Sequence, residues 1–373
     1  MSRYRKLGEF IRHIDERNKD LSVKRLLGLS IEKCFIESIA NTIGTNFQSY
    51  KIVKKGQFAY GPVTSRNGDK ITIALLNEQE CIISSSYTVF EVTDKTKLLP
   101  EYLMLWFSRP EFDRYARYKS HGSVREIFDW EEMCRVELPV PPIAEQQKIV
   151  NACNAITARI QLKQKIFDIC FRTGKSFFNE LIKRQKCKPI KLISILTILK
   201  DGTHNPPKRF TKGIPILMGQ NIVDCFIDHT GITYIQPEEY KKIHKYYEPQ
   251  ENDIVITKIG TVGKIAMLRK KDLPLAIHCN SALLRFNSEI GSTIGFWAVS
   301  SDMFLSELKK KISQTVQDFV SLGSLADADI YIPYIDENKI RCLNNLIKNM
   351  SNINDSIHCL HRIKQLLISH TTI

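Results

Sequence analysis

The stretch DGTHNPPKRF at residues 201–210 comes closer to a catalytic motif than any other part of this chain. Its Asn205-Pro206-Pro207 core matches three-quarters of the N-P-P-[aromatic] tetrad with which amino-methyltransferases hold a flipped adenine. The next residue is Lys208, so the aromatic ring that would stack on the base is missing. No G-x-G turn for a methyl donor precedes Asn205 either. Methylation by this chain itself is therefore disfavoured.

Two glycine-lysine pairs look like the end of a phosphate-binding loop but lack its first glycine. Gly174-Lys175-Ser176 would need a glycine at the position of Ile169, and Gly263-Lys264 would need one at Lys258. Gly174 also falls inside a segment with helical periodicity, where the backbone N–H groups are not free to hold phosphates. We therefore expect no nucleotide site.

The acidic and metal-ligating residues are scattered as well. Nuclease chemistry needs carboxylates clustered on strands to hold a metal ion, whereas pairs such as Glu131-Glu132 lie in segments expected to be helical or turns. The nearest set of zinc ligands, His358, Cys359 and His361, has no partner cluster at zinc-finger spacing and fits a helix face. We expect neither a catalytic residue nor a metal site.

The composition points to a protein that binds a polyanion. The 373 residues carry a net charge of +14 and an isoelectric point of about 9.2, which favours nucleic acid or an acidic membrane surface as a partner. The basic excess is densest at residues 141–186, with nine Lys and Arg against three Asp and Glu. Ten cysteines without a C-x-x-C pair, the lack of a signal peptide and the lack of a long apolar run predict a cytoplasmic protein with reduced thiols and no membrane span.

An internal repeat is the most informative feature of the sequence. Residues 124–149 and 316–340 both read as a short apolar strand, a proline stop and an acidic residue at a helix start, where the helix dipole favours negative charge. With an offset of 192, the matched pairs are Val124 and Val316, Glu126 and Asp318, Val140 and Ile332, Pro141 and Pro333, Ile143 and Ile335, and Glu145 and Glu337.

Each copy of the repeat leads into a segment with coiled-coil periodicity, in which apolar residues recur at steps of three and four. The first seam consists of Ile149, Cys153, Ile156, Ile160, Phe167 and Cys170, with Lys163 in the gap. The second consists of Leu343, Leu346, Met350, Ile353, Ile357, Leu360 and Leu367, with Lys364 in the gap. Two such seams predict two long helices that form an antiparallel coiled coil; separate packing of each helix on its own domain is the alternative. A helix over 143–184 would be about 60 Å long, which suits a spacer.

The remaining residues are expected to fold as two mixed α/β (α+β) domains. Each contains a strand, a basic loop with glycine and another strand, at 58–76 and 253–268. A further apolar strand is expected at 82–92 in the first and at 276–286 in the second. The predicted organisation is a first domain at 1–142, a helix at 143–186, a second domain at 187–333 and a helix at 334–373.

Several stretches follow the sequence of a known family. They are LPVPPIAEQQKIV at 138–150 with its weaker echo IPYIDENKI, DGTH followed by GIPILMGQNI, YKIVKKGQFAYGPVTSRNGDKI at 50–71, SSSYTVFEV at 84–92, and residues 100–128. The chain resembles, over essentially its whole length, the specificity (S) subunit of type I restriction-modification systems. The second copy of the repeat departs from the first at Asp336-Glu337-Asn338, so the two helix starts are expected to differ.

The resemblance implies a subunit without catalysis of its own that binds double-stranded DNA. Two target-recognition domains would each read one half of an asymmetric, split target, and the paired helices would set the gap between the halves. Two modification (methyltransferase) subunits would dock on it, and motor-nuclease restriction subunits would add cleavage. S-adenosylmethionine, ATP and Mg are accordingly expected on the partner subunits, and no cofactor on this chain.

Loop residues able to contact DNA form the candidate site. Arg or Lys would pair with guanine and Asn or Gln with adenine, while contacts to phosphate would add affinity. In the first domain the candidates are Thr64, Ser65, Arg66, Asn67, Lys70, Ser84, Ser85, Ser86 and Tyr87. In the second they are His204, Lys208, Arg209, Gln220, Asn221, Lys258, Thr261 and Lys264. For half of them, an ordinary solvent-exposed loop residue is the alternative.

Two other functions remain open from the sequence. An autonomous regulator would bind DNA tightly and specifically without enzyme partners. A methyltransferase in its own right would bind S-adenosylmethionine.

Overall fold

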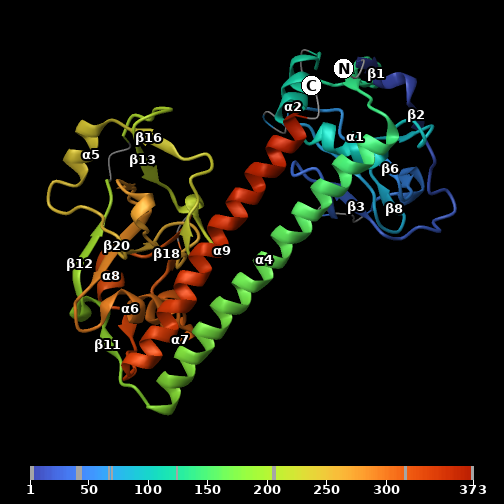
Figure 1. The fold of residues 1–373 in the computed structure, drawn as a ribbon. Helices are drawn as coiled ribbons and strands as arrows, with labels where there is room; N and C mark the ends of the chain where they lie inside the picture. Colours follow the sequence, from blue (N-terminus) through green and yellow to red (C-terminus); the bar gives the residue numbers. More distant parts are fainter. Residues whose placement is uncertain are drawn as a thin grey trace. The chain divides into compact units, whose positions relative to one another are not determined.

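The computed structural model describes residues 4–38, 44–65, 68, 70–122, 125–203, 207–314 and 317–370. The chain divides into two compact units, the first made of Met1–Gln161 with Cys359–Ile373 and the second of Leu162–His358. Both units are mixed α/β, and the two long helices α4 (Ile143–Arg184) and α9 (Glu337–His370) contribute to both (Figure 1). The mixed α/β class and the two long helices predicted from the sequence are confirmed.

A four-stranded antiparallel sheet forms the centre of the first unit. Its strands, in spatial order, are β2 (Ile11–Ile14), β9 (Thr88–Val92), β6 (Gln57–Tyr60) and β7 (Ile73–Leu75). Alternation along β6 directs Phe58 and Tyr60 into one apolar core and Ala59 into another on the opposite face. The core that contains Phe58 is shared with α1 (Pro100–Phe107), α2 (Pro110–Tyr118) and α3 (Trp130–Arg135).

Three strand pairs complete the first unit. They are β1 (Tyr4–Lys6) with β10 (Glu137–Pro139), β3 (Leu27–Leu29) with β4 (Phe35–Glu37), and β5 (Lys51–Val53) with β8 (Cys81–Ile83).

The second unit contains a sheet of the same kind. Its strands, in spatial order, are β12 (Leu196–Asp201), β20 (Ser281–Phe286), β17 (Ile254–Thr257) and β18 (Ile265–Met267). Its helices are α6 (Gly291–Ser300), α7 (Asp302–Lys310) and α8 (Leu322–Ala326). A second sheet joins β16 (Thr233–Ile235), β13 (Ile214–Leu217) and β19 (Ala276–Ile277), and α5 (Pro237–Ile243) follows β16. The smaller pairs are β11 (Ile190–Lys191) with β23 (Asp329–Ile330), β14 (Ile222–Val223) with β15 (Phe226–Ile227), and β21 (Ser313–Gln314) with β22 (Asp318–Phe319).

Equivalent backbone hydrogen bonds confirm the internal repeat, and Phe128 with Val320 and Val136 with Ala328 keep its offset of 192. The N–H of Phe128 donates to the carbonyl of Pro62 at 2.8 Å, and Val320 does the same to Lys258 at 2.8 Å. Near the start of each predicted domain, the N–H of Leu7 donates to the carbonyl of Val136 at 2.7 Å and that of Leu192 to Ala328 at 2.9 Å. Val124 and Val316, which the sequence alignment also pairs, lie outside the described residues.

The single strands expected at 82–92 and 276–286 are wrong, because each is broken by a turn. In the first, Tyr87 N–H donates to the Ser84 carbonyl at 3.1 Å, so β8 and β9 are separate strands in different sheets. In the second, Ser281 N–H donates to His278 at 3.0 Å and separates β19 from β20. Apolar residues flank each turn on both sides, so the sequence of each segment resembles that of one continuous strand.

The helix seams are largely as predicted. Cys153 and Phe167 are buried on α4, and Leu343, Met350 and Ile357 on α9. The buried seam of α9 also includes Ile347 and Asn354, which the sequence prediction did not include. It is therefore wider than a strict two-position coiled-coil stripe, because a folded domain as well as a helix packs on it.

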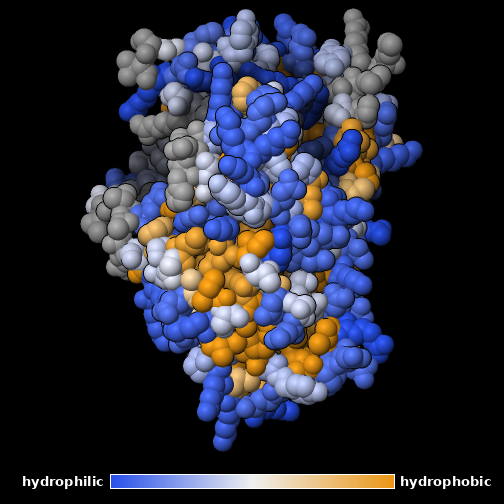
Figure 2. Space-filling view, turned by 90° about the vertical axis from the view of Figure 1, so that its left-hand side faces the viewer, coloured by the Kyte–Doolittle hydropathy of each residue, from blue (hydrophilic) through white to orange (hydrophobic). Residues whose placement is uncertain are grey.

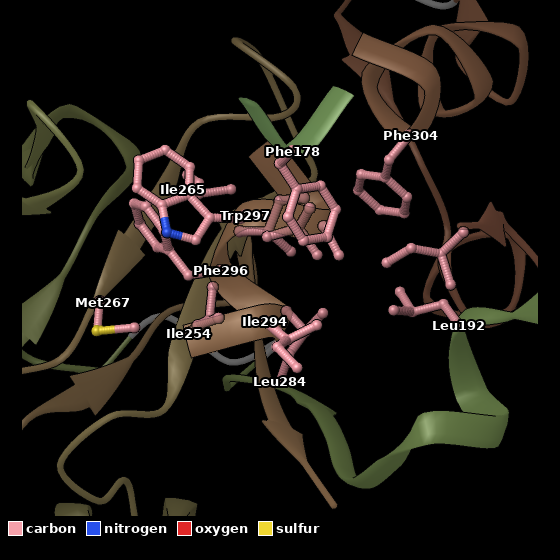
Figure 3. Close-up of a cluster of buried hydrophobic side chains, with 14 of the residues drawn as sticks. Phe178, Leu192, Ile254, Ile265, Met267, Leu284, Ile294, Phe296, Trp297 and Phe304 are labelled. Atoms are coloured by element: carbon pink, nitrogen blue, oxygen red, sulfur yellow. The ribbon is translucent and has the colours of Figure 1, made fainter. Parts of the chain in front are cut away.

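Gly174 lies within α4, where the indole of Trp297 packs on the helix. A β-carbon at Gly174 would lie 2.2 Å from the Trp297 ring, and the Phe171 ring stacks on the same indole at 6.0 Å. Close to this indole, the Phe178 ring from α4 lies next to Phe304 of α7 (Figure 3). Gly174 is thus a packing residue in a continuous helix, not part of a phosphate-binding loop.

The face drawn in Figure 2 is mostly hydrophilic, with hydrophobic residues gathered in its middle and lower part. A surface of this kind is typical of contact with another protein. Within the described ranges, no helix combines the length and apolar character needed to span a membrane.

Candidate nucleic-acid interface

Two candidate loops of the first domain leave the same edge of its central sheet. Tyr60, the last residue of β6, pairs with Thr88 at the start of β9 and with Ile73 at the start of β7. The loop at 61–72 therefore begins beside the end of the turn at 84–87, and the Tyr87 ring lies close to Gly61. We call this edge, with the loop 61–72 and the turn 84–87, the first reading edge.

The candidates at the first reading edge differ in how accessible they are. Ser85 and Ser86 are exposed, and the Ser84 and Ser86 hydroxyls lie 3.0 Å apart. Ser65 is exposed, and Lys70 is exposed and paired with Glu32 at 2.9 Å. Arg66 and Asn67 lie outside the described residues.

Thr64 is buried, with 2% of its surface accessible. Its hydroxyl lies 2.8 Å from the Ser120 hydroxyl and 3.2 Å from the carbonyl oxygen of Glu126. These bonds tie the loop to the segment between α2 and α3, so in this structure Thr64 is buried and stabilises the loop.

The second domain presents the equivalent edge. Thr257, the last residue of β17, pairs with Ser281 at the start of β20, and Asp201 at the end of β12 pairs with Ala282. The loop at 258–264 and the turn at 278–281 leave this edge together with Thr203, which bridges to His278. We call this edge, with the loop 258–264 and the turn 278–281, the second reading edge.

Two candidates of the second domain are buried. Lys258 is 3% exposed; its Nζ lies 3.1 Å from the Asp201 carboxylate and 5.4 Å from the centre of the Phe319 ring. Asn221 is 2% exposed, and its side chain accepts from Met218 N–H and donates to the Asp228 carbonyl, both at 3.2 Å. Both side chains stabilise loops from inside, which is a role that loop sequence alone does not distinguish from DNA contact.

The other described candidates of the second domain are accessible. Thr261 and Lys264 are exposed on the loop 258–264. Lys208 and Arg209 are exposed as well; the Lys208 ammonium lies 5.6 Å from the centre of the Phe210 ring and Arg209 lies 3.8 Å from the Met218 sulfur. Gln220 is exposed just after β13. His204, with Asn205 and Pro206 of the N-P-P stretch, lies outside the described residues.

Sequence reasoning missed His278, Cys279 and Asn280. The two turns share the same backbone hydrogen bond, so these residues correspond to Ser84, Ser85 and Ser86 of the first domain. The internal repeat could have identified these three residues, because aligning the strands that follow the two turns matches residues 278–281 to residues 84–87. Burial raises the pKa of the Cys279 thiol, whose sulfur lies 3.5 Å from His278 Nδ1. A protonated thiol is a weak nucleophile, so this Cys–His pair suits recognition better than catalysis.

The chain is similar to known specificity subunits in sequence and in fold. Residues 17–168 match the family model of the type I restriction modification DNA specificity domain. The type I restriction enzyme MjaVIII specificity subunit of Methanocaldococcus jannaschii is 23% identical over 291 residues, covering 70% of this chain and 68% of that protein. The S subunit of the type I restriction-modification system from M. genitalium has a TM-score of 0.52 at 15% identity, covering 99% of this chain and 95% of that one, which shows a shared fold. The resemblance drawn from the sequence is confirmed.

Proposed function

Because this chain is a relative of the specificity subunits of type I restriction-modification systems, we propose that it reads both halves of a split, asymmetric DNA target for a methyltransferase complex. Specificity subunits recognise DNA and leave catalysis to other subunits, so the chain is a recognition subunit and not an enzyme. The first domain reads one half of the target and the second domain the other.

One observation carries this proposal: the same sheet edge occurs twice with unlike side chains on it. The turn of the first reading edge is Ser84-Ser85-Ser86, and that of the second is His278-Cys279-Asn280. The repeated four-stranded sheet orients each edge in the same way within its own domain. Different hydrogen-bonding groups on the two edges would select different bases. Unlike edges therefore favour an asymmetric target.

The helices support the role of a spacer and a docking element. α4 begins in the first unit and ends in the second, and α9 runs in the opposite direction. On the part of α4 in the second unit, apolar residues are left exposed at helical spacing. They are Leu162 at 59% exposed, Ile166 at 42%, Ile169 at 58% and Phe177 at 38%. Such a stripe suits an amphipathic helix of another protein, and we assign it to the two methyltransferase subunits.

The remaining expectations belong to the same proposal. Motor-nuclease subunits join the complex for cleavage, S-adenosylmethionine, ATP and Mg bind to the partner subunits, and the complex acts on cytoplasmic DNA. The net charge of +14 suits a polyanionic ligand.

Methylome sequencing tests the proposal. Cells that express the chain together with its methyltransferase partner should carry methylated adenines or cytosines in one split sequence with a constant gap. Methylation without a split sequence would contradict it. Deletion of the chain should abolish the pattern while leaving the partner intact.

Two rivals are separated by binding measurements. An autonomous regulator predicts tight, specific binding by the chain alone in gel shifts at two salt concentrations, whereas we expect the partner to be needed for full specificity. A methyltransferase in its own right predicts that the chain alone binds S-adenosylmethionine in calorimetry, and we expect no heat of binding.

A further inference from the structure

Tyr246 projects from the second unit almost fully into solvent. Its exposed fraction is 85%, the largest among the big hydrophobic and aromatic side chains of the described residues. Lys241, Lys242 and Lys245 beside it are exposed too, and the Lys245 ammonium lies 5.2 Å from the centre of the Tyr246 ring. A ring so exposed contributes little to the stability of the fold, since it buries little apolar surface. We call residues 241–246 the Tyr246 arm.

The arm is fixed to the second reading edge on both sides. The Tyr247 hydroxyl donates to the carbonyl of Asp201 at 2.9 Å, at the end of β12. The Ile277 N–H donates to Nε2 of His244 at 3.3 Å, one residue before the turn 278–281. The buried ring of His244 lies between those of Tyr240 and Tyr247, with centroids 4.8 and 4.9 Å away. An exposed tyrosine is thus held on a rigid base next to the loops that we assign to base reading.

Acidic residues lie at the start of α5 and basic residues at its end. Glu238 and Glu239 occupy the first turn of α5, and the lysines occupy its last turn and the residues beyond, next to Tyr246. The Lys242 ammonium lies 3.6 Å from the Glu239 carboxylate. This distribution follows the helix dipole, and it leaves the end that carries Tyr246 basic.

We propose that the Tyr246 arm binds the sugar-phosphate backbone of duplex DNA beside the bases read by the second domain. Lys245 neutralises a phosphate, and the Tyr246 hydroxyl donates to a phosphate oxygen while its ring packs on the adjacent sugar. Lysine and tyrosine are common phosphate contacts, which fix the register of a protein on the duplex without reading sequence. The inference rests on the proposed DNA-reading function and adds a positioning element to it.

Fluorescence anisotropy with the full chain tests the arm. The probes are a labelled duplex enriched from a random pool by the wild-type chain together with its methyltransferase partner, and the unselected pool itself. Tyr246→Ala should weaken binding to both by about tenfold, the effect of losing a hydrogen bond to a charged group. Lys245→Ala should lower the slope of log affinity against log salt by about one. The matched control is Tyr334→Ala, because Tyr334 is 81% exposed but bonded through its backbone to Gln185 at the end of α4.

The outcomes distinguish a failure of the proposed backbone contact by the Tyr246 arm from a failure of the proposed DNA-reading function. If wild-type chain enriches a split sequence but Tyr246→Ala and Lys245→Ala bind like Tyr334→Ala, the arm is not a DNA contact. If the wild-type chain together with its methyltransferase partner enriches no split sequence, the DNA-reading proposal falls. Weaker binding of Tyr246→Ala to the unselected pool would then still support the arm. Circular dichroism of each variant checks folding, and a folded Lys245→Ala with an unchanged salt slope would overturn the phosphate contact.

Discussion

The indole of Trp297 packs directly on the backbone of α4 at Gly174, where any β-carbon would lie 2.2 Å from the ring. The indole N–H also approaches the carbonyl of Leu343 on α9 at 3.4 Å. One side chain of the second domain thus contacts both long helices, and the glycine in α4 is what allows it.

Gly174→Ala should therefore destabilise the protein despite the higher helix propensity of alanine. Helix propensity favours alanine over glycine by about 1 kcal/mol. Forcing a methyl group into a packed contact costs about 1–3 kcal/mol. Because the β-carbon would lie 2.2 Å from the Trp297 ring, we expect a cost at the upper end of that range. Urea unfolding should show a loss of about 1–2 kcal/mol. Gly28→Ala is the matched control, since a β-carbon there meets nothing within 4 Å. Equal stability of the two variants would contradict the packing role.

Gln146 should contribute strongly to the junction between the first domain and α4. It is fully buried; its carbonyl accepts from Leu99 N–H at 2.9 Å, and its amide donates to the carbonyls of Lys97 and Pro141, both at 2.8 Å. Gln146→Ala leaves these backbone groups without partners, so we expect a loss of about 2–4 kcal/mol in the free energy of unfolding. Gln147→Ala next to it should cost less than about 0.5 kcal/mol, because Gln147 is exposed.

Lowering the pH should destabilise the second domain because the buried His244 becomes protonated. Burial lowers the pKa of His244 from its ordinary 6.5 to about 4, so the unfolded chain binds the proton more readily than the folded one. The stability contributed by neutral His244 is complete above pH 6.5 and is lost as the pH falls from about 6.5 to about 4. Urea unfolding at pH 7, 5.5 and 4 should show a steeper decline for the wild type than for His244→Gln. Parallel declines would contradict this assignment.

Substitutions on the two reading edges should act on separate half-sites. Replacing Ser84, Ser85 and Ser86 with alanine should relax base preference in one half of the target only. Asn280→Ala should relax the other half, with roughly a 1–3 kcal/mol loss of discrimination if the amide makes a paired contact to a base. Each variant serves as the control for the other in methylome sequencing. A change in both halves from one variant would show that the domains do not read independently.

Lengthening α4 should change the gap and not the half-sites. Four residues inserted after Ile160 add about 6 Å of helix, which corresponds to roughly one or two base-pair steps. This position precedes Gln164, whose amide donates to Asp224 of the β14–β15 turn at 3.2 Å, so that contact is retained. Methylome sequencing should show the same two half-sites at a longer spacing. Altered bases in either half would count against the spacer role.

Periodicity and repetition alone predicted the parts of the fold that depend on local sequence. The seams around Cys153 and Met350 predicted two long helices, because a helix buries residues at steps of three and four whatever its partner is. The offset of 192 aligned Phe128 with Val320, and these two residues donate equivalent backbone hydrogen bonds in the structure.

Only the tertiary structure decided which loop residues face solvent. Thr64, Asn221 and Lys258 look like their exposed neighbours in sequence, yet each is buried by partners 7 to 62 positions away, such as Asp228 for Asn221 and Glu126 for Thr64. The same holds for the turns at 84–87 and 278–281, which lie at sheet edges only because β9 and β20 pair with distant strands. The sequence by itself determined the repeat, the two long helices and the resemblance to specificity subunits. Burial and the composition of the reading edges depend on contacts between segments far apart in the chain, and no local pattern encodes them.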